Sequence, residues 1–169
     1  MKGEFEMNKN NLKVGDRIID SDQVYVIFKI EGGKIFYQQL EGTSRGGGTG
    51  SIPMDNLDQA CIRPLMTKSE VNFFFENLDN EKPLDVPVNA NAKVNNGAFL
   101  KDILYLNNPN KTAKLLIHLS LVKSSIGKLS YLDQSIFDQG LNHLCDEIAI
   151  VTETSKEKIR EKILKGIER

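Results

Sequence analysis

The sequence predicts an α+β protein in which a small antiparallel β-barrel is followed by a C-terminal helical bundle. Two observations support this fold class. Residues 14–66 contain short runs of β-branched and aromatic residues that glycines interrupt, and residues 67–169 contain longer segments with helical spacing of apolar residues. We therefore expect two domains, residues 1–66 and 67–169. A linker at about residues 80–95 is indicated by the frequent proline and asparagine there.

Short strands are predicted throughout the first domain, because each run alternates or is rich in residues that favour extended backbone. They lie near residues 18–19, 23–30, 34–40, 51–54 and 60–63. Glu31-Gly32-Gly33-Lys34 is a hairpin signal, since glycine tolerates positive φ. Strands this short and closely spaced are typical of a small twisted barrel of the SH3 or Tudor type.

Helices are predicted over residues 67–78, 98–106, 112–122, 130–151 and 154–167. Three of them begin with a residue pair typical of a capping box, in which a hydroxyl and an acid satisfy each other's backbone N–H groups. These pairs are Thr67 with Glu70, Ser130 with Asp133, and Thr154 with Glu157. Helices of this length need one another's apolar faces, so we expect a compact bundle.

Composition excludes several classes of protein. The chain has 22 Lys and Arg against 23 Asp and Glu, so any contact with nucleic acid must come from a local patch. Two cysteines cannot build a disulfide scaffold or a multi-cysteine zinc site. No apolar run is long enough to span a membrane, and the first residues lack the apolar segment of a signal peptide. We therefore expect a cytoplasmic protein that does not engage a membrane.

No motif in the chain indicates catalysis, and we expect neither an enzyme, nor a cofactor, nor a small-molecule substrate. His118 and His143 lack partners at metal-ligand spacing, so structural roles are favoured for both. Cys61 and Cys145 are expected to be small core residues. The glycine-rich segment 46–51 has no lysine before its hydroxyl residues and is followed by proline. A hairpin tip is therefore favoured there over a phosphate loop.

Charge is unevenly distributed in the second domain. Between residues 93 and 128 there are six lysines and one acid, Asp102, whereas residues 129–150 contain acids and no lysine or arginine. The basic stretch is consistent with a phosphate-facing surface, with an ordinary charged surface, or with a contact to an acidic protein. The run Phe73-Phe74-Phe75 covers a wide arc of its helix, so it either packs between the domains or exposes a ring to a partner.

Three segments, in this order, carry a likeness to a known family. They are Leu12-Lys13-Val14-Gly15-Asp16-Arg17-Ile18-Ile19, then Ser51 to Asp58 continuing to Ile62-Arg63-Pro64, and finally Leu129-Ser130 with the helix from Phe137 to Val151. Together they resemble the CarD/CdnL family of bacterial transcription regulators. The N-terminal barrel of that family is shared with the RNA-polymerase-interacting module of transcription-repair coupling factors.

The resemblance implies that the barrel binds the RNA polymerase β subunit by pairing an exposed strand edge, while the helical domain contacts promoter DNA and stabilises the open complex. The polymerase-facing residues would be Phe36, Gln38, Thr49, Ser51 and Ile52. The DNA-facing residues would be Lys93, Asn95, Asn96, Phe99, Lys101, Lys111 and Lys114. We expect proline at Ile52 to remove an edge N–H.

The chain departs from the family where a tryptophan wedge and a basic cluster would fall. Residues 94–99 read Val-Asn-Asn-Gly-Ala-Phe, with neither tryptophan nor arginine. A large rigid apolar group is what unstacks a base step, and Val94 supplies none. The alternative function is therefore a protein–protein adaptor that retains the barrel and has lost the DNA contact.

Overall fold

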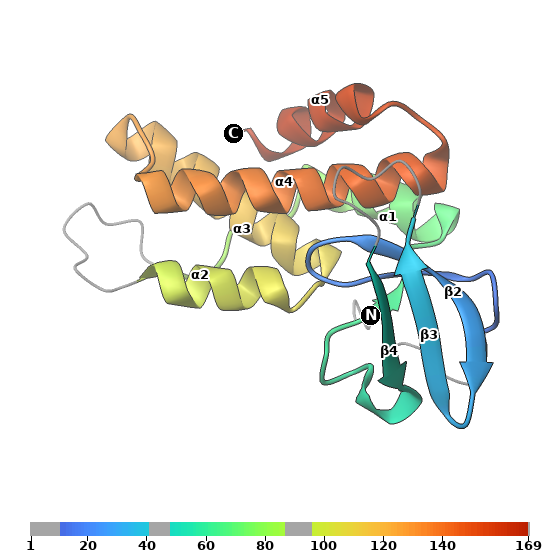
Figure 1. Ribbon diagram of the computed structural model, residues 1–169. Coiled ribbons are helices and arrows are strands. Elements are labelled where there is room, and N and C mark those ends of the chain that lie inside the picture. The colour runs from blue at the N-terminus through green and yellow to red at the C-terminus, as the bar shows by residue number, and fades with distance from the viewer. Residues whose placement is uncertain (1–10, 41–47, 87–95, 169) are drawn as a thin grey trace. The chain divides into compact units, whose positions relative to one another are not determined.

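The computed structural model describes residues 11–40, 48–86 and 96–168 (Figure 1). The chain divides into two compact units, Met1–Leu65 and Met66–Arg169. The first unit contains strands and the second contains helices, so the α+β class is confirmed.

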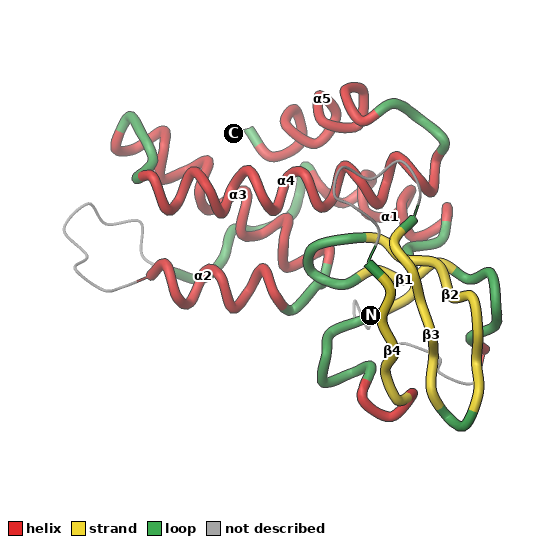
Figure 2. The backbone as a smooth tube through the Cα atoms, viewed as in Figure 1, coloured by secondary structure: helices red, strands yellow, loops and turns green. Residues whose placement is uncertain are grey.

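The first unit is built on one antiparallel sheet of five strands (Figure 2). The strands are β1 (Arg17–Ile19), β2 (Val24–Glu31), β3 (Lys34–Gln39), β4 (Thr49–Pro53) and β5 (Arg63–Pro64). Their order across the sheet is β4-β3-β2-β1-β5, so β4 and β5 are the two edges. Within the described residues no pairing joins these edges, and the expected closed barrel is not formed. β5 contributes only two residues to the ladder, which leaves little backbone for closure.

The β2–β3 hairpin has the turn that its glycines predict. Gly32 and Gly33 both have positive φ, 59° and 73°, as the two central residues of a type I′ turn require. A β-bulge between Ile27 and Lys29 then inserts Phe28 as an extra residue in β2. The strand pattern of the sequence predicts the hairpin but contains no signal for the bulge.

One face of the sheet carries the core of this unit. Ile18, Ile27, Ile35, Leu57 and Ile62 form a buried cluster. The last predicted strand is shifted, because residues 57–61 form a turn and pairing begins only at Arg63. Cys61 lies in that turn with a φ of 54° and is partly exposed, so the prediction that it is a core strand residue is wrong. Its left-handed backbone cannot continue a strand.

The described residues of the second unit form five helices, α1 (Lys68–Leu78), α2 (Asn96–Tyr105), α3 (Pro109–Ile126), α4 (Tyr131–Thr152) and α5 (Lys156–Ile167), which Figure 1 labels. The long helix α4 packs against the other four. Leu100, Leu104, Leu115, Leu119 and Ile136 from α2, α3 and α4 form a buried cluster. The bundle is thus held by apolar faces, as helices of modest length require.

The helix starts test the predicted caps. At α1 both capping-box bonds form: the Glu70 N–H donates to Thr67 Oγ1 over 3.1 Å, and the Thr67 N–H donates to Glu70 Oε1 over 3.0 Å. At α4 the Asp133 N–H donates to Ser130 Oγ over 3.1 Å. At α5 the prediction is wrong by one residue, because Ser155 is the N-cap and its hydroxyl accepts from the Lys158 N–H.

The first part of the predicted linker is packed against the second unit. Leu84 lies against the core cluster, and its N–H donates to the Lys114 carbonyl over 3.3 Å. Residues 80–86 are therefore held against α3, and residues 87–95 of the predicted linker lie outside the described residues. The proline and asparagine content gave no signal for this contact, since it depends on one apolar side chain and one backbone bond.

Candidate functional site

The edge strand β4 has one side that no described strand covers. Its side chains alternate between the two faces of the sheet. Ile52 packs against the buried core cluster, and Gly50 lies under the ring of Tyr37. A Cβ on Gly50 would lie 2.7 Å from Tyr37 Cζ, so only glycine fits without a shift of the ring. Thr49, Ser51 and Pro53 are exposed on the opposite face.

The hydrogen-bond register shows which backbone groups of β4 face outward. Gln39 N–H donates to the Gly48 carbonyl over 2.9 Å, and Met54 N–H donates to the Gly33 carbonyl over 2.8 Å. Bonded pairs alternate with non-bonded pairs in an antiparallel ladder, so Gly50 and Ile52 direct their backbone groups toward β3.

By the same alternation, Thr49 and Ser51 direct their N–H and carbonyl groups away from the sheet. Pro53 occupies the next outward position, where its missing N–H interrupts no bond to β3. The expectation that Ile52 supplies an edge N–H is therefore wrong. Proline there would break the ladder with β3, and the outward donors are those of Thr49 and Ser51.

An aromatic pair lies beside this edge on the outer face of the sheet. Phe36 is the cross-strand partner of Ser51, and its ring centroid lies 6.4 Å from that of Phe28. Lys29 Nζ lies 5.3 Å from the Phe36 centroid and 2.6 Å from Glu31 Oε2. The hydrogen bond and charge of Lys29 lower the pKa of the Glu31 carboxyl. Phe28 remains 44% exposed because the bulge turns it outward.

The structure brings together four of the five predicted polymerase-facing residues. Phe36, Gln38, Thr49 and Ser51 share the outer face of β3 and β4, where Phe36 pairs with Ser51 and Gln38 with Thr49. Ile52 lies on the core face instead. Sequence reasoning missed Phe28, since simple alternation along β2 does not reveal the bulge that exposes it.

The predicted DNA-facing residues are placed less completely. Lys93 and Asn95 lie outside the described residues, and for Asn96 only the backbone at the start of α2 is described. On α2, Phe99 is 48% exposed and Lys101 is partly buried. Lys111 is exposed in the first turn of α3.

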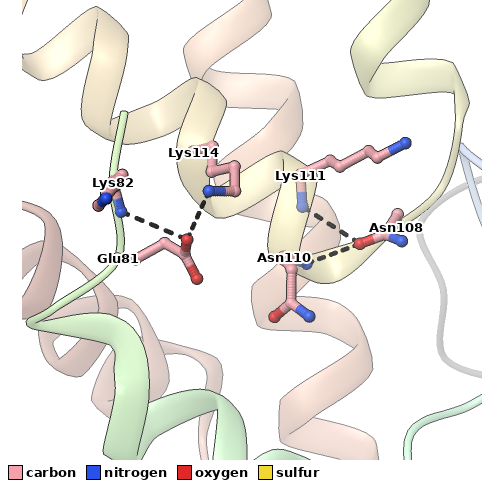
Figure 3. A network of polar contacts seen from close by, with 6 residues as sticks. All are labelled: Glu81, Lys82, Asn108, Asn110, Lys111 and Lys114. Carbon is pink, nitrogen blue, oxygen red and sulfur yellow. Dashed lines mark hydrogen bonds and ion pairs between the residues drawn. The ribbon is translucent and has the colours of Figure 1, made fainter. Parts of the chain in front are cut away.

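Lys114 belongs to a polar network with the packed segment before α2 (Figure 3). Its Nζ lies 2.7 Å from Glu81 Oε1, and both side chains are largely covered. Asn108 caps α3 through its Oδ1, which accepts from the N–H groups of Asn110 and Lys111 over 3.0 Å and 3.2 Å. The Lys111 ammonium extends away from this network (Figure 3). The charge of Lys114 is therefore already offset, whereas no carboxylate among the described residues pairs with Lys111.

The histidines and the helical cysteine are buried in the second unit. His143 Nε2 lies 2.9 Å from Asn107 Oδ1, and His118 is only 3% exposed. Burial raises the pKa of the Cys145 thiol to about 11, so this sulfur stays protonated near neutral pH. Among the described residues no group of three or more His, Cys, Asp or Glu side chains could hold a metal ion. No described helix combines the length and apolar character that crossing a bilayer requires.

No protein-family model matches the chain, and no curated protein matches it in sequence.

Proposed function

We propose that this protein is a non-enzymatic, cytoplasmic transcription regulator of the CarD/CdnL type. Its first unit, an open form of an SH3- or Tudor-like barrel, binds the RNA polymerase β subunit. Its helical unit acts near promoter DNA, where it stabilises the open complex and so modulates initiation. The observation that supports this proposal most directly is the β4 edge, at which Thr49 and Ser51 present outward backbone groups that no described strand pairs.

Strand addition explains how such an edge binds a protein. An extended segment of the partner pairs with the outward N–H and carbonyl groups, so the main chain supplies affinity and alternate side chains supply specificity. Each hydrogen bond contributes a net of about 0.5–1.5 kcal/mol. Thr49 and Ser51 each offer a donor and an acceptor, and Pro53 adds an acceptor. A short guest strand can therefore form a cooperative ladder on β4.

Ser51→Pro tests this proposal in the full-length protein. The substitution deletes one outward N–H at a position that makes no bond to β3, so the sheet is retained. We expect binding to the purified β lobe of a bacterial RNA polymerase, measured by isothermal titration calorimetry, to weaken by about tenfold or more.

Ser51→Ala is the matched control, because it removes the hydroxyl and keeps the N–H; its affinity should stay within about twofold of the parent, a difference well below 1 kcal/mol. Circular dichroism melting of both variants confirms that the sheet is intact. Parental affinity in a folded Ser51→Pro variant would show that β4 does not pair with the polymerase.

The adaptor that lacks DNA contact is a second candidate function, and the Lys114–Glu81 ion pair favours it. Of the described lysines assigned to DNA, Lys114 is neutralised and Lys101 is partly buried. Salt dependence separates the two functions, because each phosphate contact steepens the fall of log affinity with log salt. A shallow slope for the protein on polymerase–promoter complexes supports the adaptor. A steep slope that Lys111→Glu reduces supports the DNA-contacting regulator.

A further inference from the structure

The outer face of the sheet also indicates what kind of strand β4 accepts. We propose that the guest strand carries a large apolar side chain opposite Ser51 and an acidic side chain opposite Pro53. The apolar side chain crosses over Ser51 to reach the ring of Phe36, which Phe28 supports from its other side. This inference rests on the proposed function and names the partner chemistry of the same edge.

The position of the apolar side chain follows from the register. Directly paired residues of neighbouring strands point to the same face, so a guest residue opposite Ser51 shares the outer face with Ser51 and Phe36. Strands lie about 4.8 Å apart, so the guest backbone lies two spacings from β3, roughly 10 Å. The guest side chain and the Phe36 ring must together span this distance between the guest backbone and β3. Only a long or aromatic guest side chain does so.

The outer-face side chains of β4 are too small to fill the space between a guest strand and the Phe36 ring. Ser51 and Thr49 are the outer-face residues of β4 beside Phe36 and Gln38, and both are small and exposed. On its other side the Phe36 ring is already contacted by Lys29 and Phe28. The side of the ring toward β4 is therefore where a guest side chain adds apolar contact. Burial of aromatic surface of this kind typically dominates the energetics of an interface.

The acidic position follows from Lys34. Lys34 is exposed and is the cross-strand partner of both Glu31 and Pro53. Glu31 is already ion-paired with Lys29, and no described carboxylate pairs with Lys34. A carboxylate of the guest residue opposite Pro53 can approach the Lys34 ammonium, because the Pro53 side chain between them carries no charge. One guest residue therefore separates the acidic position from the apolar position.

The test compares the affinity of full-length variants for the purified polymerase β lobe by isothermal titration calorimetry. We expect Phe36→Ala and Ser51→Phe each to weaken binding by about tenfold, and Phe28→Ala to weaken it less. Ser51→Phe keeps the backbone donor and the Phe36 ring but fills the space that the guest side chain needs. Phe73→Ala removes another exposed phenylalanine, 41% exposed on α1, and should leave the affinity unchanged. Lys34→Glu should weaken binding at low salt and have less effect at high salt.

The Ser51→Pro variant distinguishes the two levels of the proposal. Weak binding by Ser51→Pro, Phe36→Ala and Ser51→Phe, with normal binding by Phe73→Ala, supports both the edge and the apolar guest side chain. If Ser51→Pro binds weakly while Phe36→Ala and Ser51→Phe bind like the parent, the proposal that β4 pairs with the guest stands. The proposal of an apolar guest side chain is then overturned. Parental binding by Ser51→Pro would overturn both.

Discussion

At the scale of single residues, His118 shows how burial controls a titratable group. It lies on α3, is 3% exposed, and its Nδ1 has no hydrogen-bond partner among the described residues. Desolvation lowers the pKa of this imidazole, and the negative charge of Asp133 offsets the effect only in part. The side chain is therefore neutral in the folded protein at neutral pH.

This burial makes the stability of the second unit depend on pH. The unfolded chain binds a proton at His118 near pH 6.5, whereas the folded chain binds it only at lower pH. The free energy of unfolding is thus undiminished above that value and decreases as the pH falls toward the folded pKa. Urea denaturation between pH 7.5 and 5 should show the decrease, and His118→Gln should flatten it. An identical slope in both proteins would contradict the assignment to His118.

The sequence predicts which residues lie near the β4 edge, but not which of them direct their backbone N–H groups outward. The sequence placed Thr49, Ser51, Phe36 and Gln38 near one edge, and the structure puts them on one face of β3 and β4. The sequence does not show which alternate residues of β4 direct their N–H groups outward, because this depends on the register of the β3–β4 pairing. For the same reason the sequence predicts an edge N–H at Ile52, whereas the register gives the outward N–H to Ser51.

At the scale of helices, two glycines mark close approaches of different tightness. A Cβ on Gly166 of α5 would overlap the side chain of Leu78 on α1, whose Cγ would lie 2.7 Å away. A Cβ on Gly140 of α4 would lie 3.3 Å from Leu116 Cδ2 and from Thr112 Cγ2 on α3. Glycine thus lets α5 pack directly against α1, whereas α4 and α3 have slightly more room.

Alanine at these two positions should therefore have different effects. Either substitution favours the helix by roughly 0.5–1 kcal/mol. At Gly166 we expect overpacking of about 1–3 kcal/mol to exceed this gain, so the free energy of unfolding decreases. At Gly140 the gain and the tight contact should nearly cancel. Thermal denaturation of the two single variants measures the difference, and a Gly166→Ala protein as stable as Gly140→Ala would contradict the close packing of α1 and α5.

Sequence signals located each of the helices that the structure describes, and the errors at their ends have local causes. The predicted helix over residues 112–122 is extended in α3 to Pro109–Ile126, because Asn108 caps it and proline is tolerated in the first turn. α5 begins one residue late, because Glu153 ends α4 in the left-handed region and Ser155 then becomes the cap. The contact of Leu84 with the core could not be predicted, since a single apolar residue in a polar segment has no periodicity.

At the scale of the whole molecule, each unit has its own buried core. Ile35 belongs to the cluster under the sheet, and Leu119 belongs to the cluster between α2, α3 and α4. The second unit begins at Met66. The N–H of Met66 donates a 2.7 Å hydrogen bond to the fully buried carboxylate of Glu147 on α4. Each unit therefore has an apolar core built from its own residues.

We expect core substitutions to act on one unit at a time. Ile35→Ala should lower the stability of the first unit by about 2–5 kcal/mol, and Leu119→Ala should do the same for the second unit. Amide hydrogen exchange by mass spectrometry reports both units in one experiment. Faster exchange in the helices of the Ile35→Ala variant, comparable to that in its strands, would show that the two cores unfold as one.

Pro53, which ends β4, also limits self-association of the protein. An uncovered sheet margin invites copies of the same chain to stack into fibrils. Here the outward side of β4 offers donors at only two positions before Pro53 interrupts the row. Two copies paired through this margin would share only these few bonds, and the proline of each copy would interrupt their ladder, which disfavours continued stacking.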